Sequence, residues 1–403
     1  MKFPYKIILF CLVVIVLAPH CASAIIFNDY LEYFYNRYSQ HFDTNGLKYA
    51  VPDYGIKKMT FPAAPREIIG LASYYKFRAL KNDLSAQFLI KNQIIKSLTL
   101  LETQTHFSFN DSEALFLSYI LDKQITNLLS FEEKVRLNQT ILSLLENGLL
   151  AKDTENRAFI SAAHFQFLIN EFYNKGLINS AEKVKLDQLA KEKTDSAIKQ
   201  SISPAGWYRE NKLFSAHYQA VSAYMLLIYS QLTKNSEYQA LIYKMYTNLK
   251  SLSFDNGLIE AKIGHRPTGL GAQFYLMMGL IGTYFQDEEA NTFLSYSQGN
   301  TFFRDKKYPN RLEYHCTACS QSSNFHDDYA FSDVAELSLV LLSPTSSINL
   351  STKNKISVFN LDDSEFKITH QKKIITIKDK IKRNNLIIKQ SSSEKNYLKK
   401  YFY

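Results

Sequence analysis

The sequence has few cysteines, a single tryptophan and no long apolar run after its N-terminus. Its 403 residues include four cysteines and one tryptophan. No segment beyond residue 24 approaches the roughly 20 apolar residues that a membrane-spanning helix needs, so no span is predicted. The phosphate-binding patterns GxxxxGKS and GxxxxGKT, the dinucleotide pattern GxGxxG and the hydrolase elbow GxSxG are also absent. Their absence excludes nucleotide-driven and α/β-hydrolase chemistry.

The N-terminus has the pattern of a secretory signal peptide. Two lysines precede an apolar run over residues 7–18, and the sequence ASA at residues 22–24 is a small-x-small cleavage signal. We expect cleavage after Ala24 and a product that is secreted or periplasmic, so residues 1–24 are set apart from the fold. The alternative is a lipid anchor on Cys21, but residues 18–20 are a poor lipobox.

The two cysteines that stay after cleavage lie close together. Cys316 and Cys319 stand in the segment EYHCTACSQSSNFHDDY. In an exported protein this spacing favours a small disulfide loop. The alternative is a zinc site completed by His315 and His326, but the second C-x-x-C of a common structural zinc site is absent. The sequence therefore predicts no cofactor, with zinc as the less favoured alternative.

The positive charge is concentrated at the C-terminal end. The formal net charge is +9, and loss of Lys2 and Lys6 with the signal peptide leaves +7. Residues 346–403 hold thirteen Lys and Arg against five Asp and Glu. For a secreted chain this balance favours an acidic polysaccharide or oligosaccharide as partner and not a nucleic acid. The alternative is a merely solvated tail.

Apolar residues recur with spacings of three and four from residue 68 onward, which is typical of helices. Six segments are apolar on nearly all sides and start roughly 45 to 60 residues apart. Amphipathic helices separate them and can cover them. The sequence therefore predicts repeated helical hairpins. The apolar segments are residues 67–80, 111–121, 158–173, 214–232, 269–285 and 331–342, and the amphipathic ones are residues 132–150, 180–200 and 236–252.

Helical hairpins of this kind form an open solenoid or a closed toroid. The long, irregular loops favour the toroid, because solenoid repeats are more uniform. We therefore predict a mainly α protein, with an (α/α) toroid of about six hairpins, complete or incomplete, in residues 25–345. The basic region 346–403 contains four short β-branched segments, which predict a small antiparallel sheet against one edge of the helical body. These segments are residues 355–361, 365–370, 372–379 and 384–390.

The loops that enter the apolar helices are rich in charged, amide and aromatic residues. In a ring of hairpins these loops converge at one end of the axis, so we expect a polar, aromatic-lined mouth that binds a ligand. Trp207 is interpreted as a sugar-stacking platform, with a half-buried packing role as the alternative. The residues predicted to bind substrate are Trp207, Tyr208, Arg209, Glu210, Asn211, Gln219, Glu260, His265, Gln273, Asn156 and Arg157.

The segment FDNGLIEAKIGHRPTG, residues 254–269, carries a more specific pattern. It resembles Asp-Gly-x-Leu-x-Glu-x-x-Arg-Gly-x-Arg, which opens an inner helix in the alginate-lyase-like (α/α) toroid polysaccharide lyases. Ile263 stands where that pattern has its first Arg. The residues that match it are Leu258, Glu260, Gly264 and Arg266, and Gly257 lies one residue after the place of the pattern's Gly. His217 and Tyr218 are similar to the Asn-His-aromatic run of the preceding inner helix, although Ala216 replaces the Asn and no tyrosine aligns with the family's catalytic one.

This resemblance implies β-elimination on a uronic-acid polymer. The C5 proton of a uronate is weakly acidic until its carboxylate is neutralised, so the site needs donors at that group, a base at C5 and an acid at the leaving oxygen. His217 is predicted to neutralise the carboxylate or take the proton, and Arg266 to hold the acidic group. Gln219 or Asn211 is predicted to assist Arg266, and Tyr218, Tyr208 or Tyr275 is predicted to protonate the leaving oxygen. The structural alternatives are a core histidine at His217 and a pair of Arg266 with Glu260.

Other functions remain open on the same scaffold. A 5-epimerase needs the same groups plus a second proton donor. An inverting glycoside hydrolase needs two carboxylates separated by room for water. A non-catalytic glycan-binding protein fits the departures from the lyase pattern. His164, in the middle of a predicted helix, is interpreted as a core residue. The candidate carboxylates of a hydrolase are Glu113, Glu210, Asp255, Glu260, Asp327 and Asp328.

Overall fold

A computed structural model describes the central helices and the C-terminal strands of the chain. Contacts divide the chain into two compact units, Met1–Ala151 with His326–Ser346, and Lys152–Phe325 with Ser347–Tyr403. The residues that the structure describes are 42–43, 46–47, 84–103, 107, 109–153, 155–210, 213–257, 259, 272–293, 302–304, 312–314, 357, 360–371, 374–381 and 384–389.

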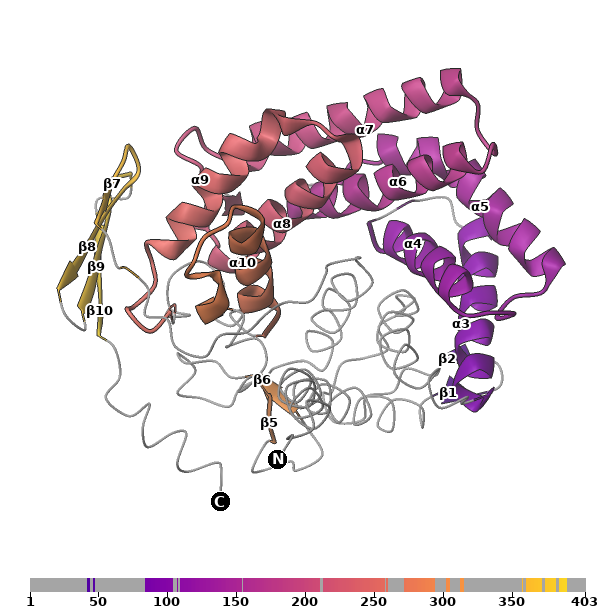
Figure 1. Cartoon of the computed structure of the whole chain (residues 1–403), viewed down its shortest axis with the longest axis horizontal. Helices are drawn as coiled ribbons and strands as arrows, with labels where there is room; N and C mark the ends of the chain where they lie inside the picture. Colours follow the sequence, from indigo (N-terminus) through magenta and orange to yellow (C-terminus); the bar gives the residue numbers. More distant parts are fainter. Residues whose placement is uncertain are drawn as a thin grey trace, which may run out of the picture. The chain divides into compact units, whose positions relative to one another are not determined.

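The described part of the first unit contains three long helices, α3 (Leu84–Thr103), α4 (Phe109–Gln124) and α5 (Phe131–Leu150) (Figure 1). Each of these helices packs against the other two. A capping box starts α5, because the Ser130 side chain accepts the Glu133 N–H and the Glu133 carboxylate accepts the Ser130 N–H. The sequence around Ser130 therefore sets the start of this helix.

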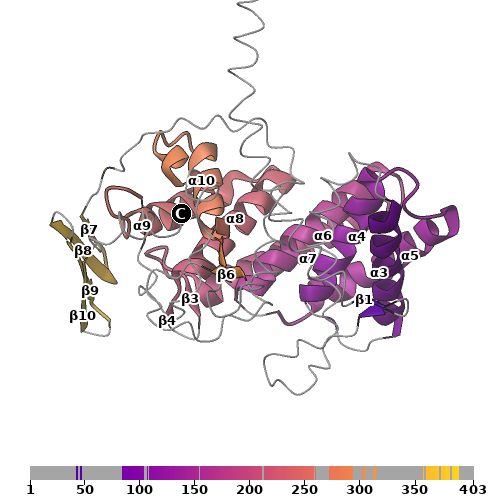
Figure 2. The same ribbon diagram turned by 90° about the horizontal axis from the view of Figure 1, so that it is seen from below.

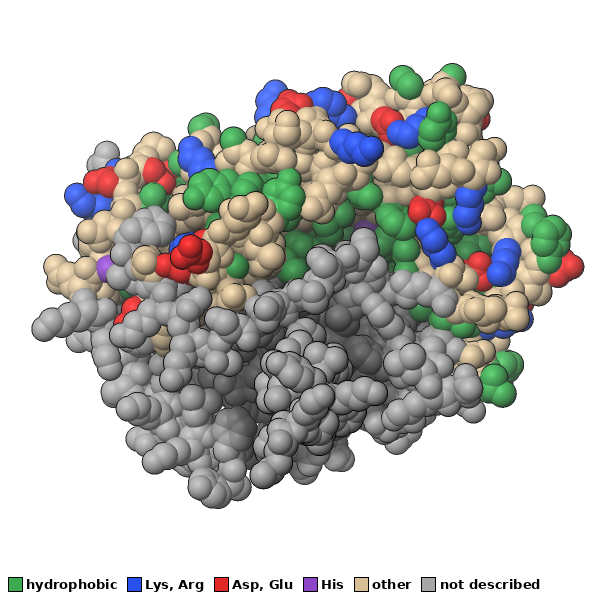
Figure 3. All heavy atoms as spheres, in the orientation of Figure 1, with side chains coloured by type: hydrophobic (Ala, Val, Ile, Leu, Met, Phe, Trp, Pro, Cys, Tyr) green, Lys and Arg blue, Asp and Glu red, His purple; other side chains and the backbone are tan. Residues whose placement is uncertain are grey.

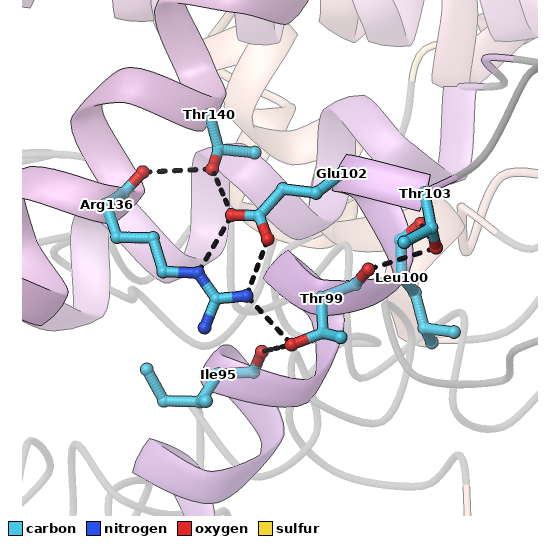
Figure 4. A network of polar contacts seen from close by, with 7 residues as sticks. All are labelled: Ile95, Thr99, Leu100, Glu102, Thr103, Arg136 and Thr140. Atoms are coloured by element: carbon cyan, nitrogen blue, oxygen red, sulfur yellow. Dashed lines mark hydrogen bonds and ion pairs between the residues drawn. The ribbon is translucent and has the colours of Figure 1, made fainter.

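A bidentate ion pair joins α3 to α5 (Figure 4). Arg136 donates from Nε and Nη2 to the two carboxylate oxygens of Glu102, at 2.8 and 2.6 Å. Arg136 Nη2 also donates to Thr99 Oγ1 at 2.8 Å, and Thr140 donates to Glu102 at 3.0 Å. The hydrogen bond from Arg136 is the main reason that the pKa of Glu102 lies below its ordinary 4.5. The planar fork fixes the two helices in register.

The second unit is built around helix α8 (Ala216–Thr233), which packs against α6 (Asn156–Asn174), α9 (Gln239–Lys250) and α10 (Ala272–Tyr284). Helix α7 (Ser180–Ser201) packs on α6, and the 3-10 turn η3 (Ser236–Tyr238) leads into α9. Figures 1 and 2 both show α9 and α10 beside α8. This arrangement places α8, a largely buried apolar helix, at the centre of the unit.

Burial follows the predicted alternation of enclosed and covering helices. The side chains of α4 are buried from Asp111 to Leu121, and α6, α8 and α10 are buried along most of their described lengths. Helices α5, α7 and α9 keep an exposed face, and Figure 3 shows Lys and Arg interspersed with Asp and Glu along α5 and α7. The mainly α architecture is therefore confirmed. The predicted helices at residues 67–80 and 331–342 lie outside the described residues.

The C-terminal strands form one antiparallel sheet in the order β10-β9-β8-β7. Its strands are β7 (Leu361–Asp362), β8 (Phe366–Gln371), β9 (Ile374–Asp379) and β10 (Asn384–Lys389). Phe366, Ile368, Ile375 and Ile377 alternate along β8 and β9 and are at most 6% exposed. This period of two gives the sheet one buried face. The small C-terminal sheet predicted from the sequence is therefore confirmed.

Three two-stranded ribbons complete the described strands. They are β1 (Phe42–Asp43) with β2 (Gly46–Leu47), β3 (Arg209–Glu210) with β4 (Leu213–Phe214), and β5 (Phe302–Arg304) with β6 (Leu312–Tyr314). The β3–β4 ribbon leads directly into α8 and positions the candidate site. Within the described part of the chain, none of the helices combines the length and the apolar content that a bilayer crossing requires.

Candidate functional site

The entrances of α6 and α8 meet at Tyr208. The Tyr208 hydroxyl accepts the backbone N–H of Asn156, the first residue of α6, at 3.0 Å. The Tyr208 ring lies edge to face with Tyr218, in the first turn of α8, with 6.3 Å between ring centroids. The expectation that helix entrances converge therefore holds for these two helices of the second unit. Tyr208 itself is 0% exposed and positions its neighbours, which corrects its predicted role as a substrate contact.

His217 and Tyr218 form the accessible part of this cluster. Both side chains are half-buried, and their rings pack at 5.2 Å between centroids. Ser215 caps α8 by accepting the Tyr218 N–H, which fixes the first turn on which both rings stand. An imidazole and a phenol at one helix entrance can bind an anion or transfer a proton. These two predicted residues stay candidates.

Glu155 and Glu210 lie on the two segments that meet at Tyr208. Burial raises the pKa of Tyr208 well above 10, the Asn156 hydrogen bond opposes this, and the charges of Glu155 and Glu210 raise the pKa further. Glu210 is 6% exposed in β3, and Glu155 is half-buried just before α6. The charges of both carboxylates therefore act on one buried phenol.

Glu155 is the residue that the sequence analysis did not select. Its backbone has φ 59° and ψ −134°, a region that residues other than glycine rarely adopt. The composition of the loop singled out its neighbours Asn156 and Arg157, but no sequence pattern reports a positive φ at a glutamate. Asn156 is half-buried and contacts Tyr208, whereas Arg157 is exposed in the first turn of α6.

Gln219 has a structural role. It is 0% exposed, its Oε1 accepts the Tyr208 N–H at 2.9 Å, and its Nε2 donates to the Met245 carbonyl at 2.8 Å. Both ends of the amide are therefore engaged in holding the loop before β3 to α9. This geometry corrects the prediction that Gln219 contacts substrate.

Trp207 is a packing residue and not a sugar-stacking platform. Its side chain is 1% exposed, and its ring lies edge to face with Phe214 and Phe366 at 5.1 and 4.7 Å between centroids. Its Nε1 donates to Asp363 at 2.7 Å. A sugar needs a free ring face to stack, and none is available here. The tryptophan instead anchors the C-terminal sheet to the helices of the same unit.

Arg209 also faces the sheet. Its guanidinium forms an ion pair with Glu365 and lies over the Phe366 ring, 5.8 Å from the centroid. The predicted substrate contact of Arg209 is therefore corrected to an internal one. His370 adds a further link, since its Nε2 lies 2.9 Å from the Ser251 carbonyl. Burial lowers the pKa of His370 below 6.5, which favours the neutral ring in this contact.

Tyr275 supports the loop that precedes α10. It is 4% exposed, and its hydroxyl accepts the Ile259 N–H at 3.1 Å. The prediction that Tyr275 protonates a leaving group is therefore corrected, because its hydroxyl is enclosed and bonded to backbone. Residues of the lyase-like segment that follow Ile259 lie outside the described residues, namely Glu260, His265 and Arg266.

The remaining predicted residues have mixed outcomes. His164 is 3% exposed, and burial lowers its pKa to about 3, so it is the neutral core histidine that was expected. Asp255 is exposed, and Glu113 is buried in α4 of the first unit. Among the described residues, no group of three or more His, Cys, Asp or Glu is placed to hold a metal. The candidates outside the described part are Asn211, the Gln273 side chain, His315, Cys316, Cys319, His326, Asp327 and Asp328.

Solved structures match the chain, whereas no family model and no curated protein does. A protein from Listeria innocua matches with a TM-score of 0.52 and 12% identity, over 78% of this chain and 96% of that one. The unsaturated glucuronyl hydrolase of Bacillus sp. GL1, described as responsible for the degradation of glycosaminoglycan, matches with a TM-score of 0.52 and 9% identity, over 78% and 94% of the two chains.

The chain shares the (α/α) toroid fold of the unsaturated glucuronyl hydrolases. A variant of such an enzyme, in a structure named with the oligosaccharide dGlcA-Glc-Rha-Glc, matches with a TM-score of 0.52 and 10% identity, over 78% and 94% of the chains. Identities this low establish the fold alone. The predicted toroid is thereby confirmed, but the structures that match are named as hydrolases and not as alginate lyases.

Proposed function

We propose that the protein hydrolyses an oligosaccharide that contains a uronic acid. The observation that carries this proposal is that two carboxylates lie on the two segments that meet at Tyr208. Glu155 precedes Asn156, whose N–H bonds to the Tyr208 hydroxyl, and Glu210 follows Tyr208 by two residues. The fold shared with unsaturated glucuronyl hydrolases supports the same reaction class. Of the functions considered from the sequence, a hydrolase on a toroid scaffold thus has more support than the lyase.

The proposed chemistry divides the work between the two carboxyl groups. One donates a proton to the sugar as the glycosidic bond breaks, and the other takes a proton from the attacking water. Glu210, at 6% exposure in β3, is assigned the role of the acid. Glu155 is more accessible and is assigned the role of the base that takes a proton from the attacking water. His217 in its charged form, together with Arg157, binds the uronate carboxylate.

Charge-neutral substitutions test this assignment. Glu155→Gln and Glu210→Gln are each expected to lower kcat by about a hundredfold or more, because each removes a proton-transfer group. The matched control is Glu192→Gln, on the exposed face of α7. Products are measured by mass spectrometry on glycosaminoglycan-derived oligosaccharides, since hydrolysis adds one water to the sum of the fragments. Wild-type rates in both site variants contradict the proposal.

β-Elimination is the second candidate, and the ring pair of His217 and Tyr218 at the start of α8 favours it. In this reaction His217 takes the C5 proton and Tyr218 protonates the leaving oxygen, so no water is consumed. The same mass measurement separates the reactions, because elimination leaves an unsaturated fragment and a total mass equal to that of the substrate. Under elimination, Tyr218→Phe abolishes the rate and Glu155→Gln leaves it near wild type.

A further inference from the structure

Two carboxylates of the turn between β7 and β8 are turned toward the helices. Asp363 accepts the Trp207 indole N–H at 2.7 Å, and Glu365 pairs with Arg209. Burial lowers the pKa of Arg209, and the charges of Asp379 and Asp363 oppose that shift, so Asp379 also acts on this inner side. Asp363 and Glu365 therefore attach the sheet to its own unit.

The lysines of β8 and β9 lie on the opposite, outward face. Lys367 and Lys378 are exposed and stand directly across from each other in the β8–β9 register, whereas Ile368 and Ile377, the next pair along, are 0% and 4% exposed on the inner face. Directly opposed like charges destabilise an antiparallel pair. An arrangement of this kind gains stability when an anion lies over it.

The acidic groups of the outward face do not neutralise these lysines. Asp362 pairs with Lys367 at 3.2 Å and with Lys380 at 2.5 Å, so one carboxylate serves two ammonium groups. Within the described part of the chain, no acidic side chain pairs with Lys378. The residues that join β8 to β9 in the sequence are Lys372 and Lys373. The outward face therefore carries a net positive charge.

The rest of this face identifies the kind of anion. Thr369 and Thr376 form the next outward pair, and Ile387 of β10 stands beside Thr376 with 62% exposure. The described residues of the face include no aromatic side chain, whereas single-stranded nucleic acids are bound by stacking on aromatics and interfacial membrane segments use aromatic anchors. Ammonium and hydroxyl groups on a flat surface suit a chain that carries repeated carboxylates or sulfates and hydroxyls.

We propose that the outward face of β8–β9, centred on Lys367 and Lys378, binds an acidic polysaccharide. This binding is separate from the site at Tyr208 and does not require catalysis there. The surface holds the polymer by charge, while the helical site acts on a sugar unit. A substitution can therefore abolish polymer binding at the sheet and leave catalysis at the helical site intact, or the reverse.

The test measures polymer binding by the full-length protein. Labelled polygalacturonate and heparin are titrated at an ionic strength of about 0.05 M, where screening is weak. Neutral dextran, duplex DNA and vesicles of phosphatidylglycerol with phosphatidylcholine are titrated in parallel. The site variant is the double substitution Lys367→Gln with Lys378→Gln. Its matched control is Lys185→Gln with Lys199→Gln, which removes the same charge from the exposed face of α7.

We expect the sheet variant to bind both acidic polymers about tenfold more weakly, with a shallower salt dependence because fewer counterions are released. The α7 control stays near wild-type affinity. All four lysines are exposed, so thermal unfolding serves to confirm that each variant is folded. Unchanged affinity in the sheet variant overturns the proposal, as does stronger binding of DNA, vesicles or dextran than of the acidic polymers. Persistent polymer binding in Glu155→Gln shows that the surface acts without the helical site.

Discussion

Backbone strain at Glu155 is the feature at the residue scale that most clearly separates function from packing. A glutamate at φ 59° and ψ −134° costs about 1–3 kcal/mol relative to an unstrained residue. Glycine adopts this conformation readily, yet the position holds a charged side chain. The hydrogen bond from the next N–H, of Asn156, to Tyr208 holds the strained turn in place. Strain at one member of the proposed carboxylate pair supports the role that we propose for its side chain.

Replacement of this residue by glycine is expected to raise stability and lower activity together. Glu155→Gly relieves the strain, and the gain is about 1 kcal/mol once the extra backbone entropy of glycine is deducted. Urea unfolding gives the stability, and the hydrolysis assay gives the activity. Glu155→Gln is the control, because it keeps the strained backbone and removes only the charge. A clear loss of stability in Glu155→Gly contradicts the assignment of strain.

The aromatic cluster around residue 207 shows where reasoning from residue type reaches its limit. Trp207, Tyr208 and Arg209 have the chemistry of a sugar site, and the loop composition alone cannot tell a free ring from an enclosed one. The deciding partners, Asp363, Glu365 and Phe366, are about 156 residues away in sequence. Neither periodicity nor spacing reports such a contact. Sequence reasoning therefore places these side chains at the correct helix entrance, but it does not show that they face the C-terminal sheet and not a ligand.

At the scale of elements, a buried ion pair connects the loop before α6 to α7. Lys193 Nζ lies 2.9 Å from Asp153 Oδ2, and the two side chains are 6% and 7% exposed. Ser161 donates to the same Asp153 oxygen at 2.8 Å. Removing one partner leaves a buried charge without compensation, which is expected to cost about 3–5 kcal/mol.

Substitution of this pair gives a prediction with an internal control. Lys193→Met is expected to lower the free energy of unfolding by about 3 kcal/mol, and Asp153→Asn by a similar amount. The double variant loses less than the sum, because it leaves no isolated charge. Urea denaturation of the four proteins measures this coupling. Additive losses contradict the idea that the two charges stabilise each other.

Ion pairs connect Lys250 of α9 to Asp287 and Glu289, in the segment after α10. The stability that they contribute is expected to depend on pH. Burial opposes ionisation of Asp287, but hydrogen bonds from Lys250, the Glu289 N–H and Tyr246 outweigh it and hold the pKa below 3.8. Burial likewise opposes the charge of Lys250, and its bonds to Asp287 and Glu289 raise the pKa above 10.5. The stability from Asp287 is present above its ordinary pKa and disappears as the pH falls through the lowered value. The stability from Lys250 is present below 10.5 and disappears at higher pH.

Asp287→Asn tests the acid side of this dependence. The difference in free energy of unfolding between wild type and variant is expected to be constant between about pH 5 and 9 and to shrink below about pH 4. Urea titrations at several pH values measure the difference. The control is Asp255→Asn, at an exposed position, which is expected to show no such trend. A difference that grows on acidification contradicts the assigned sign.

The order and type of the elements could be predicted because local physics determines them. Apolar residues at spacings of three and four report the enclosed helices α4, α6, α8 and α10, and the period of two in β8 and β9 reports one buried face. Ser130 and Asn179 mark helix starts through capping boxes that are visible in the sequence. Of the strand predicted at residues 355–361, Leu361 lies in β7, Ser357 and Asn360 lie outside any strand, and the other residues are outside the described part of the chain.

At the scale of the whole molecule, the chain consists of two compact units with different internal supports. The first relies on the Glu102–Arg136 pair between α3 and α5, and the second on α8 and the sheet anchored by Trp207. Because the chain has one tryptophan and it lies in the second unit, its fluorescence reports on that unit alone. Far-ultraviolet circular dichroism reports on the helices of both.

The unfolding transitions measured by fluorescence and by circular dichroism are therefore expected to have different midpoints in a denaturant titration. Lys193→Met shifts the fluorescence transition to lower urea, because its ion pair belongs to the second unit. Arg136→Gln removes an exposed network worth about 0.5–1 kcal/mol and shifts part of the circular dichroism transition while leaving fluorescence unchanged. Coincident transitions in wild type and in both variants contradict independent units. They indicate instead that the toroid unfolds in one cooperative step, in which case a change in either unit moves both signals equally.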